Sequence, residues 1–270
     1  MALTKFQRSI CLLIAENRLE QGESYVAGGA ALNALVAGHR VSHDIDLFHD
    51  TREALEATWD SDCALLERNG YALDVIRERP AFVEAIVSRG EERVLMQWTC
   101  DSAYRFFPLV QHDEFGLVLH PFDLATNKVL ALVGRLEVRD WIDVITCHEK
   151  IQRLGYLAWA SCGKDPGFSP TSILAEARRS SHYTDAELAE LAFAGPKPCA
   201  AALGKSWRHM MEEADKIVES LPPQEAGKCV LTLTGELYRG GTAELREALA
   251  AEQILFHEGA VRGSLPQIIG

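Results

Sequence analysis

The sequence predicts an α/β fold, in which a small mixed β-sheet with flanking helices precedes a mostly helical C-terminal region. Short apolar runs bounded by glycine or proline are typical of strands, and in the first half of the chain they alternate with segments of helical spacing. After Gly163 the composition changes, because glycine and proline cluster there and helical patterns then dominate. We therefore expect one domain at residues 1–163 and a helical region at residues 164–270.

The N-terminal part of the chain alternates helical and strand patterns. Apolar residues at helical spacing, such as Ile10 and Ile14, predict a first helix that ends at Gly22. Polar and apolar residues alternate from Asp44, as in a half-buried strand, and Thr51 is a typical N-cap for the helix that follows. The expected elements are a helix at 4–21, a strand at 24–27, a helix at 30–37, a strand at 44–48 and a helix at 51–68.

Three strand-like runs come next in the chain. Pro80 and Gly90 separate them, which is typical of an antiparallel meander. The expected strands are at 71–77, 82–88 and 93–100. Beyond them, helical spacing predicts helices at 123–135, 139–154, 185–193, 206–221 and 243–256.

Composition and charge exclude several classes of protein. A chain of 270 residues with 47% hydrophobic and 24% charged residues can form a substantial core, which argues against disorder. No segment approaches the roughly 20 apolar residues of a membrane helix, and the N-terminus lacks a secretory signal, so we expect a cytoplasmic protein with no membrane partner. The seven cysteines form no CxxC pair, which predicts reduced thiols. The net charge of −12 means that an RNA partner would need a local basic patch.

A glycine pair begins the most informative segment, which covers residues 25–48. Gly28 and Gly29 lie between an expected strand and an expected helix. Glycine permits a sharp turn there, and backbone N–H groups at the start of a helix suit a phosphate. Taken alone, a Gly-Gly pair is more often an ordinary turn.

Two aspartates follow on the next expected strand. Asp44 and Asp46 are two residues apart, so both carboxylates would point to the same face. Carboxylates so close together repel each other unless a cation or hydrogen-bond donors compensate, and Mg²⁺ prefers such oxygen ligands. The pair therefore predicts an anchor for a magnesium-bound nucleotide, although the solvent-facing edge of a strand explains the two aspartates alone equally well.

The combination of these features is more specific than its parts. A Gly-Gly turn, a short helix, Arg40-x-Ser42 and then Asp44-x-Asp46 in an apolar strand resemble the signature of the nucleotidyltransferase superfamily. Within it, the sequence is similar to the AbiEii/AbiGii toxin family, whose members resemble polymerase-β-type nucleotidyltransferases. The resemblance implies a nucleotidyltransferase-like mixed sheet at residues 1–163.

A second stretch adds to this resemblance, which covers residues 25–145 in all. Asp123 and Lys128 lie on one expected helix, and an Arg-Asp-x-x-Asp motif that ends at Asp143 lies on the next. The family shows similar residues in the same order. Without the first motif, these charges are more typical of ion pairs on a helix surface.

The resemblance implies a role for each of these residues. A nucleoside triphosphate such as ATP or GTP would be the substrate, and one or two Mg²⁺ ions would bind Asp44 and Asp46. Lys128 would neutralise phosphate charge, and Asp143 would shape the site or orient Lys128. The expected nucleotide-binding residues are Gly28, Gly29, Arg40, Ser42, Lys128 and Asp143, and the expected catalytic residues are Asp44, Asp46, Asp101 and Lys128.

Two residues depart from the family pattern. Polymerase-like sites place a third carboxylate on a later strand, and the expected strand at 93–100 holds Gln97 in that place. Glutamine cannot accept a proton, so Asp101, which follows on the same side by alternation, is the candidate general base. The second departure is Asn127, where the pattern predicts an acidic residue beside the lysine.

Three functions remain open at this point. The first is magnesium-dependent transfer of a nucleoside monophosphate to a hydroxyl, with release of pyrophosphate. The resemblance implies an RNA acceptor such as tRNA and a partner antitoxin, as in a toxin–antitoxin or phage-defence pair. The second is nucleotidyl transfer to a small cationic acceptor such as an aminoglycoside. The third is a nucleotide-binding regulatory protein that has lost turnover, and Gln97 favours it.

An RNA acceptor would require basic residues, and the C-terminal half offers a set of them. A solvated helix face explains the same residues, and the net acidity of the chain favours that interpretation. The candidates, with the aromatic side chains between them, are Arg178, Arg179, Lys197, Lys205, Trp207, Arg208 and His209.

Overall fold

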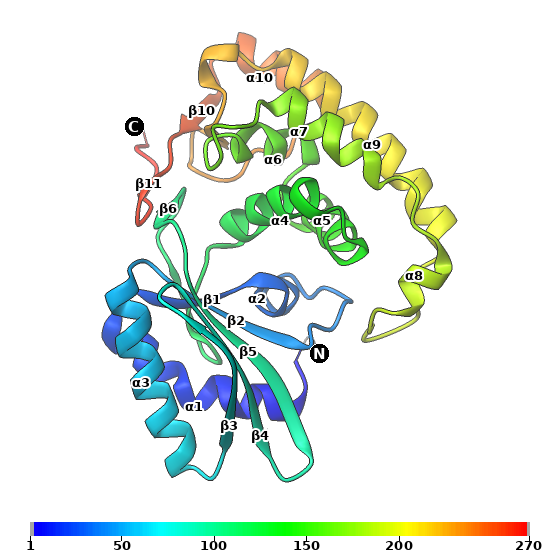
Figure 1. The fold of residues 1–270 in the computed structure, drawn as a ribbon. Coiled ribbons are helices and arrows are strands. Elements are labelled where there is room, and N and C mark those ends of the chain that lie inside the picture. Colours follow the sequence, from blue (N-terminus) through cyan, green and yellow to red (C-terminus); the bar gives the residue numbers. More distant parts are fainter. Residues whose placement is uncertain (1–2, 269–270) are drawn as a thin grey trace. The chain divides into compact units, whose positions relative to one another are not determined.

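A computed structural model describes residues 3–268 and divides the chain into two compact units (Figure 1). Unit 1 comprises the residues up to Ala103 together with Pro108–His120. Unit 2 comprises Tyr104–Phe107 and the residues from Pro121 onward. The boundary expected near Gly163 lies inside unit 2, and a functional division at that residue stays a prediction.

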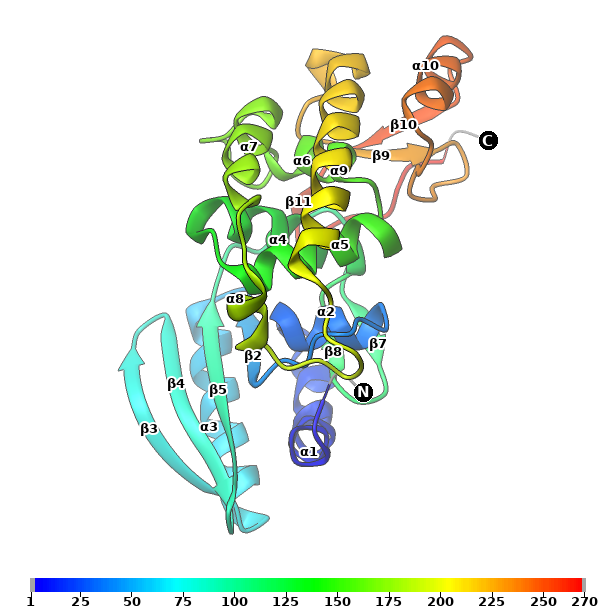
Figure 2. The ribbon, with the colours of Figure 1, turned by 90° about the vertical axis from the view of Figure 1, so that its right-hand side faces the viewer.

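Unit 1 is built on a seven-stranded mixed sheet with the strand order β3-β4-β5-β2-β1-β8-β7, which confirms the predicted α/β fold. Strand β2 pairs antiparallel with β1 and parallel with β5, and β3, β4 and β5 form the predicted antiparallel meander (Figure 2). The strands are β1 (Ser24–Ala27), β2 (Asp44–His49), β3 (Ala72–Arg79), β4 (Phe82–Arg89), β5 (Glu92–Cys100), β7 (Val110–His112) and β8 (Gly116–Val118). The helices are α1 (Lys5–Gln21), α2 (Gly28–Leu35) and α3 (Arg52–Arg68).

The helices of unit 1 begin and end where local chemistry directs them. Thr4 and Gln7 form a capping box at the start of α1, and Gly22 ends it in the left-handed conformation with φ of 70°. The Thr51 side chain accepts a hydrogen bond from the N–H of Ala54 at 3.0 Å and caps α3 as predicted. One difference is that α2 begins at Gly28 itself and not at residue 30.

The two faces of the sheet differ in chemistry. On one face, Leu47 of β2 is paired with Trp98 of β5, and both side chains are fully buried. The Trp98 indole N–H donates to an Asp62 carboxylate oxygen of α3 at 2.9 Å, so α3 covers this face. Asp62 is also paired with the buried guanidinium of Arg18 from α1. The opposite face carries Asp44 and Asp46, which are only partly buried.

Unit 2 is mostly helical, as predicted for the C-terminal part of the chain. Its long helix α9 contacts both α6 and α7 (Figure 2). The helices are α4 (Pro121–Arg135), α5 (Val138–Lys150), α6 (Leu154–Ser161), α7 (Pro170–Ala177), α8 (Asp185–Ala189), α9 (Ala200–Ser220) and α10 (Thr242–Ala250), with 3₁₀ turns at Arg178–Ser180 and Pro223–Glu225. Two short antiparallel pairs complete it, β9 (Cys229–Thr232) with β10 (Ile254–His257) and β6 (Tyr104–Arg105) with β11 (Ala260–Val261).

Several helix boundaries in unit 2 differ from the predictions. The helix expected at 139–154 ends at Lys150, and the separate helix α6 begins at Leu154. The helix expected at 243–256 ends at Ala250, because Glu252 adopts a positive φ of 53° and the next apolar run pairs with β9 as a strand. Helix α8 is shorter than predicted, and α9 begins six residues earlier than the expected start at 206. Among residues 3–268, no helix combines the length and apolar character that a membrane crossing requires.

Candidate functional site

Gly28 brings the backbone of unit 1 directly against the Asp46 carboxylate. Strands β1 and β2 pair Ala27 with Asp46, and Gly28 follows at once with a left-handed φ of 68°. A Cβ atom on Gly28 would lie 1.8 Å from Asp46 Oδ2, so only glycine leaves room for the carboxylate there. The Asp46 carboxylate therefore lies directly against the backbone at the start of α2.

Gly29 makes a similar close approach to the loop that precedes β2. A Cβ atom there would lie 2.2 Å from Arg40 Nη2 and 3.2 Å from Ser42 Oγ. Arg40 and Ser42 are both buried, and the Ser42 carbonyl accepts a hydrogen bond from Gln7 Nε2 of α1 at 3.0 Å. The structure thus brings Gly29, Arg40 and Ser42 together, and their role in nucleotide binding stays a prediction.

The start of α2 has the chemistry of an anion site. Its N-cap is Ala27, which offers no side-chain cap to the first N–H groups of the helix. Those N–H groups carry the positive end of the helix dipole, which favours a phosphate. A guanidinium beside Gly29 adds positive charge at the same end of the helix.

The two aspartates of β2 share one face, as their spacing predicts. Asp44 and Asp46 are partly buried, whereas Ile45 and Leu47 between and after them are fully buried on the other face. Among residues 3–268, no group of three or more histidine, cysteine, aspartate or glutamate side chains is arranged to hold a metal ion. Two carboxylates still fit Mg²⁺, because that ion usually takes one or two carboxylates and fills its other positions with water and substrate phosphate.

The strand next to β2 carries an amide where a third carboxylate is expected. Gln97 of β5 is the register partner of Asp46, and Glu84 of β4 is in turn the partner of Gln97. Gln97 Nε2 donates a hydrogen bond to Glu84 Oε1 at 2.8 Å. Glu84 was not predicted as a site residue, although a single acid inside the apolar run at 82–88 is a signal that could have indicated it.

Asp101 does not lie in this row. It follows the last residue of β5, its N–H donates to the His49 carbonyl, and its carboxylate accepts the Ser102 N–H at 2.7 Å. It lies four positions after Gln97, which is about 13 Å along an extended strand. The structure therefore does not bring Asp101 to Asp46, and this placement does not support its predicted role as general base.

His49 lies at the end of β2, on the buried face of the sheet. Its Nε2 is 3.1 Å from Ser24 Oγ and its Nδ1 is 3.2 Å from the Thr99 carbonyl oxygen. Burial lowers the pKa of His49 to about 4, so the ring is neutral near pH 7. It points away from the face of the aspartates and has a structural role.

Lys128 of α4 forms a buried charge cluster inside unit 2. Its Nζ lies 2.9 Å from Asp143 Oδ2 and 3.2 Å from Asp140 Oδ1. Arg135 Nε donates to Asp140 at 2.6 Å. Burial raises the pKa of Asp140, but the hydrogen bond from Arg135 and the positive charges of Lys128 and Arg135 outweigh it and lower that pKa. Asp143 is thus placed to orient Lys128, and the role of both residues in nucleotide binding stays a prediction.

Asp123 holds a different part of unit 2 in place. Its buried carboxylate accepts the backbone N–H groups of Phe106 and Phe107 at 2.8 and 3.0 Å, and Lys164 Nζ lies 2.8 Å from it. Lys164 also donates to the Asn127 side-chain oxygen at 2.8 Å. Asn127 therefore accepts a hydrogen bond from Lys164 within unit 2, and this contact gives the departure from the family pattern a structural explanation.

The basic residues of the C-terminal half do not form a base-stacking surface around Trp207. That side chain is fully buried and packs edge-on against Trp141, with ring centroids 6.2 Å apart. Arg178 is paired with Asp215, and Arg179 is paired with Glu176 at 2.7 Å. These ion pairs agree with a solvated helix face.

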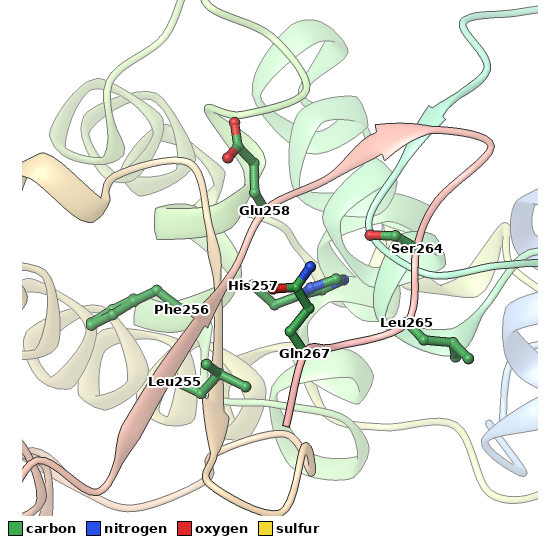
Figure 3. Close-up of a pocket in the computed structure, with 7 residues that line it drawn as sticks. All are labelled: Leu255, Phe256, His257, Glu258, Ser264, Leu265 and Gln267. Atoms are coloured by element: carbon green, nitrogen blue, oxygen red, sulfur yellow. The ribbon is translucent and has the colours of Figure 1, made fainter. Parts of the chain in front are cut away.

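The structure has two cavities that the aspartates do not line. One of about 360 Å³ in unit 2 is lined by the C-terminal segment around His257 (Figure 3), whose Nε2 is 2.8 Å from the Phe106 carbonyl oxygen. The other, of about 680 Å³, lies in unit 1 between α3 and the β3–β4 hairpin, beside Trp59. Neither is lined by Asp44 or Asp46.

Solved structures share the fold of this chain. A proposed nucleotidyltransferase from Helicobacter pylori aligns with a TM-score of 0.52 and 16% identity, over 82% of this chain and 99% of its own. JHP933 from Helicobacter pylori aligns with a TM-score of 0.50 and 14% identity, over 78% and 91%. MenT4, a nucleotidyltransferase toxin from Mycobacterium tuberculosis H37Rv, aligns with a TM-score of 0.52 and 15% identity, over 80% and 83%.

These likenesses establish a nucleotidyltransferase-like fold. No protein-family model matches the chain, and no curated protein matches it. The identities of 14% to 16% show the fold alone and do not single out the AbiEii/AbiGii family within the superfamily.

Proposed function

We propose that the chain is a magnesium-dependent nucleotidyltransferase, which transfers a nucleoside monophosphate from a nucleoside triphosphate to a hydroxyl acceptor. The observation that carries this proposal is the contact of Gly28 with Asp46. It places the start of α2, which we propose binds phosphate, against the carboxylate that we propose binds the metal, and a Cβ atom on Gly28 would overlap Asp46 Oδ2 at 1.8 Å. The nucleotidyltransferase-like fold of the solved neighbours supports the same conclusion.

Different residues of unit 1 would bind the cation and the phosphates of the nucleotide. Asp44 and Asp46 would hold the cation, which when bound neutralises phosphate charge and activates the α-phosphate. The N–H groups of Gly28 and Gly29 would donate to phosphate oxygens, and Ser42 would donate through its hydroxyl. Catalysis would then rest on positioning and charge neutralisation.

Arg40 and Lys128 are the cations proposed to neutralise further phosphate charge. Arg40 lies beside Gly29, at the start of α2. Lys128 is fixed by Asp143 within unit 2. Lys128→Met is expected to raise the KM for the nucleotide. The control is Lys164→Met, because Lys164 is a second lysine of unit 2 that is paired with Asp123 of α4. Lys164→Met is expected to leave that KM unchanged in folded protein.

For the acceptor we propose RNA, with tRNA as the first candidate, and a role as the toxin of a toxin–antitoxin pair. The support is the resemblance of the two motifs to the AbiEii/AbiGii family and the likeness to MenT4, which is described as a nucleotidyltransferase toxin. The net charge of −12 favours a small cationic acceptor instead, such as an aminoglycoside.

A second candidate function is nucleotide binding without turnover. Two observations favour a binding-only protein. Gln97, the register partner of Asp46, cannot act as a base, and Asp101 lies beyond the end of β5. Neither residue therefore supplies a general base next to the proposed cation.

The test is transfer of label from each α-³²P nucleoside triphosphate, with Mg²⁺, to total RNA or to an aminoglycoside. Asp46→Ala is the inactive variant, and Asp74→Ala, an exposed carboxylate on β3, is the matched control. We expect label in RNA with the wild type and with Asp74→Ala only. Label in the aminoglycoside names the other acceptor, and nucleotide binding without any product or pyrophosphate release establishes the binding-only function.

A further inference from the structure

The hydrogen bond between Glu84 and Gln97 fixes the orientation of the Gln97 amide. An ionised carboxylate can only accept hydrogen bonds, so the amide atom that lies 2.8 Å from Glu84 must be the donor Nε2. The amide oxygen Oε1 leaves the same carbon in another direction and cannot face Glu84. β5 lies between β4 and β2, so Gln97 has Glu84 as its register partner on one side and Asp46 as its register partner on the other.

We propose that Glu84 is a positioning residue, which holds Gln97 as a neutral oxygen ligand for the cation of Asp44 and Asp46. The inference rests on the proposed function, since it assigns the third protein oxygen of the same cation site. Carbonyl oxygens, like carboxylates and water, are ligands that suit Mg²⁺. Gln97 is one strand spacing, about 4.8 Å, from Asp46, so the two side chains can meet at one cation.

The same pair explains why the row holds an amide in place of a third carboxylate. A glutamate at position 97 would put two carboxylates at hydrogen-bond distance, and they would repel each other. The amide donates to Glu84 and presents an oxygen on its other side. The cation site therefore carries the two negative charges of Asp44 and Asp46, and Gln97 contributes no base.

A mutant cycle with Mn²⁺ tests the pair without relying on turnover. Free Mn²⁺ is measured by EPR during titration of the wild type, Glu84→Ala, Gln97→Ala and the double variant. We expect each single variant to weaken Mn²⁺ affinity by about threefold to tenfold, and the double variant to be no weaker than Gln97→Ala, because Glu84 acts only through Gln97. Glu84→Gln should keep wild-type affinity, since its amide oxygen still accepts from Nε2.

The exchanged variant Glu84→Gln/Gln97→Glu provides a gain-of-affinity test. It keeps a hydrogen bond between the two strands and moves the carboxylate from β4 to β5, next to Asp46. We expect it to bind Mn²⁺ about tenfold more tightly than the wild type, because a third charge faces the cation. Asp74→Ala, which removes a carboxylate from β3, should leave the affinity unchanged.

The outcomes separate this inference from the proposed function. If Asp46→Ala abolishes Mn²⁺ binding but Glu84→Ala, Gln97→Ala and the exchanged variant bind like the wild type, the positioning role is overturned and the cation site stands. If Asp46→Ala binds Mn²⁺ as tightly as the wild type, the proposed function fails with it. Thermal unfolding of each variant identifies misfolding, and the exchanged variant decides the matter if an alanine variant does not fold.

Discussion

At the scale of single residues, Gly28 is the position where backbone conformation and site chemistry meet. Its φ of 68° is unfavourable for any other residue, and its missing side chain leaves space that a Cβ atom would share with Asp46 Oδ2. Backbone strain and steric conflict can be separated, because Gly70 has a similar φ of 77° with no heavy atom within 4 Å of an added Cβ.

Gly28→Ala is expected to lower the free energy of unfolding by about 2 to 4 kcal/mol, from positive-φ strain and from displacement of Asp46. It should also abolish Mn²⁺ binding. Gly70→Ala carries the strain alone and should cost about 1 kcal/mol with normal Mn²⁺ binding. Urea unfolding and Mn²⁺ titration check both variants, and equal effects of the two substitutions would show that Asp46 is not crowded.

The pH dependence of stability is expected to reflect His49. Burial lowers its pKa from 6.5 to about 4, so between these values the unfolded chain binds a proton that the folded chain does not. The free energy of unfolding should therefore fall as the pH decreases from 6.5 towards 4, by up to about 3 kcal/mol from this residue. Urea unfolding at pH 7 and pH 5 checks this, and His49→Gln should show a smaller decrease. An unchanged decrease in that variant would assign the effect to other groups.

At the scale of elements, one buried ion pair ties two helices to the sheet. Asp62 of α3 accepts hydrogen bonds from Arg18 of α1 and from the Trp98 indole of β5. Both charged side chains are fully buried. The network therefore fixes α1 and α3 on one face of the sheet. The other face, which carries Asp44 and Asp46, holds the proposed site.

Asp62→Ala is expected to cost about 3 to 5 kcal/mol, because it leaves the Arg18 guanidinium buried without its carboxylate. The double variant Arg18→Met/Asp62→Leu should cost less, since it removes both charges and keeps apolar volume. Urea unfolding measures both. A double variant less stable than Asp62→Ala would mean that the attraction between Arg18 and Asp62 exceeds the free-energy cost of burying the two charges.

The elements that the sequence predicts well are those that local patterns determine. The strand at 24–27, the alternation from Asp44 and the cap at Thr51 all depend on neighbouring residues, and the structure has each of them. The apolar run Ile254–His257 fits a helix equally well by pattern. It becomes a strand because β9 pairs with it, and β9 lies more than 20 residues away in sequence.

The candidate site, like the elements, could be predicted only where it depends on local sequence. The motif places Gly28, Asp44 and Asp46 by local spacing, and the structure brings Gly28 and Asp46 into contact. A lone acid in an apolar run marks Glu84 as unusual, but local spacing does not connect it with Gln97, because that relation depends on the register of two paired strands. Asp101 satisfies the alternation but lies beyond the end of β5, so alternation alone overestimated its reach.

At the scale of the whole molecule, the fold and the charge point to different partners. The fold is shared with MenT4, a nucleotidyltransferase toxin, whereas a net charge of −12 disfavours broad contact with RNA. If RNA is the acceptor, its binding should depend on a small number of basic residues and should weaken with salt, with a slope proportional to the number of phosphates that they neutralise. Labelling of RNA at 50 and 200 mM salt checks this, and RNA labelling that is independent of salt would show that basic residues do not carry the RNA binding.

The most direct test of the metal and nucleotide site is a crystal structure of the chain with Mn²⁺ and a non-hydrolysable nucleoside triphosphate. We expect an anomalous Mn²⁺ peak between Asp44 and Asp46, with phosphate oxygens against the N–H groups of Gly28 and Gly29. A nucleotide bound elsewhere, or Mn²⁺ bound without these two carboxylates, would contradict the proposed function.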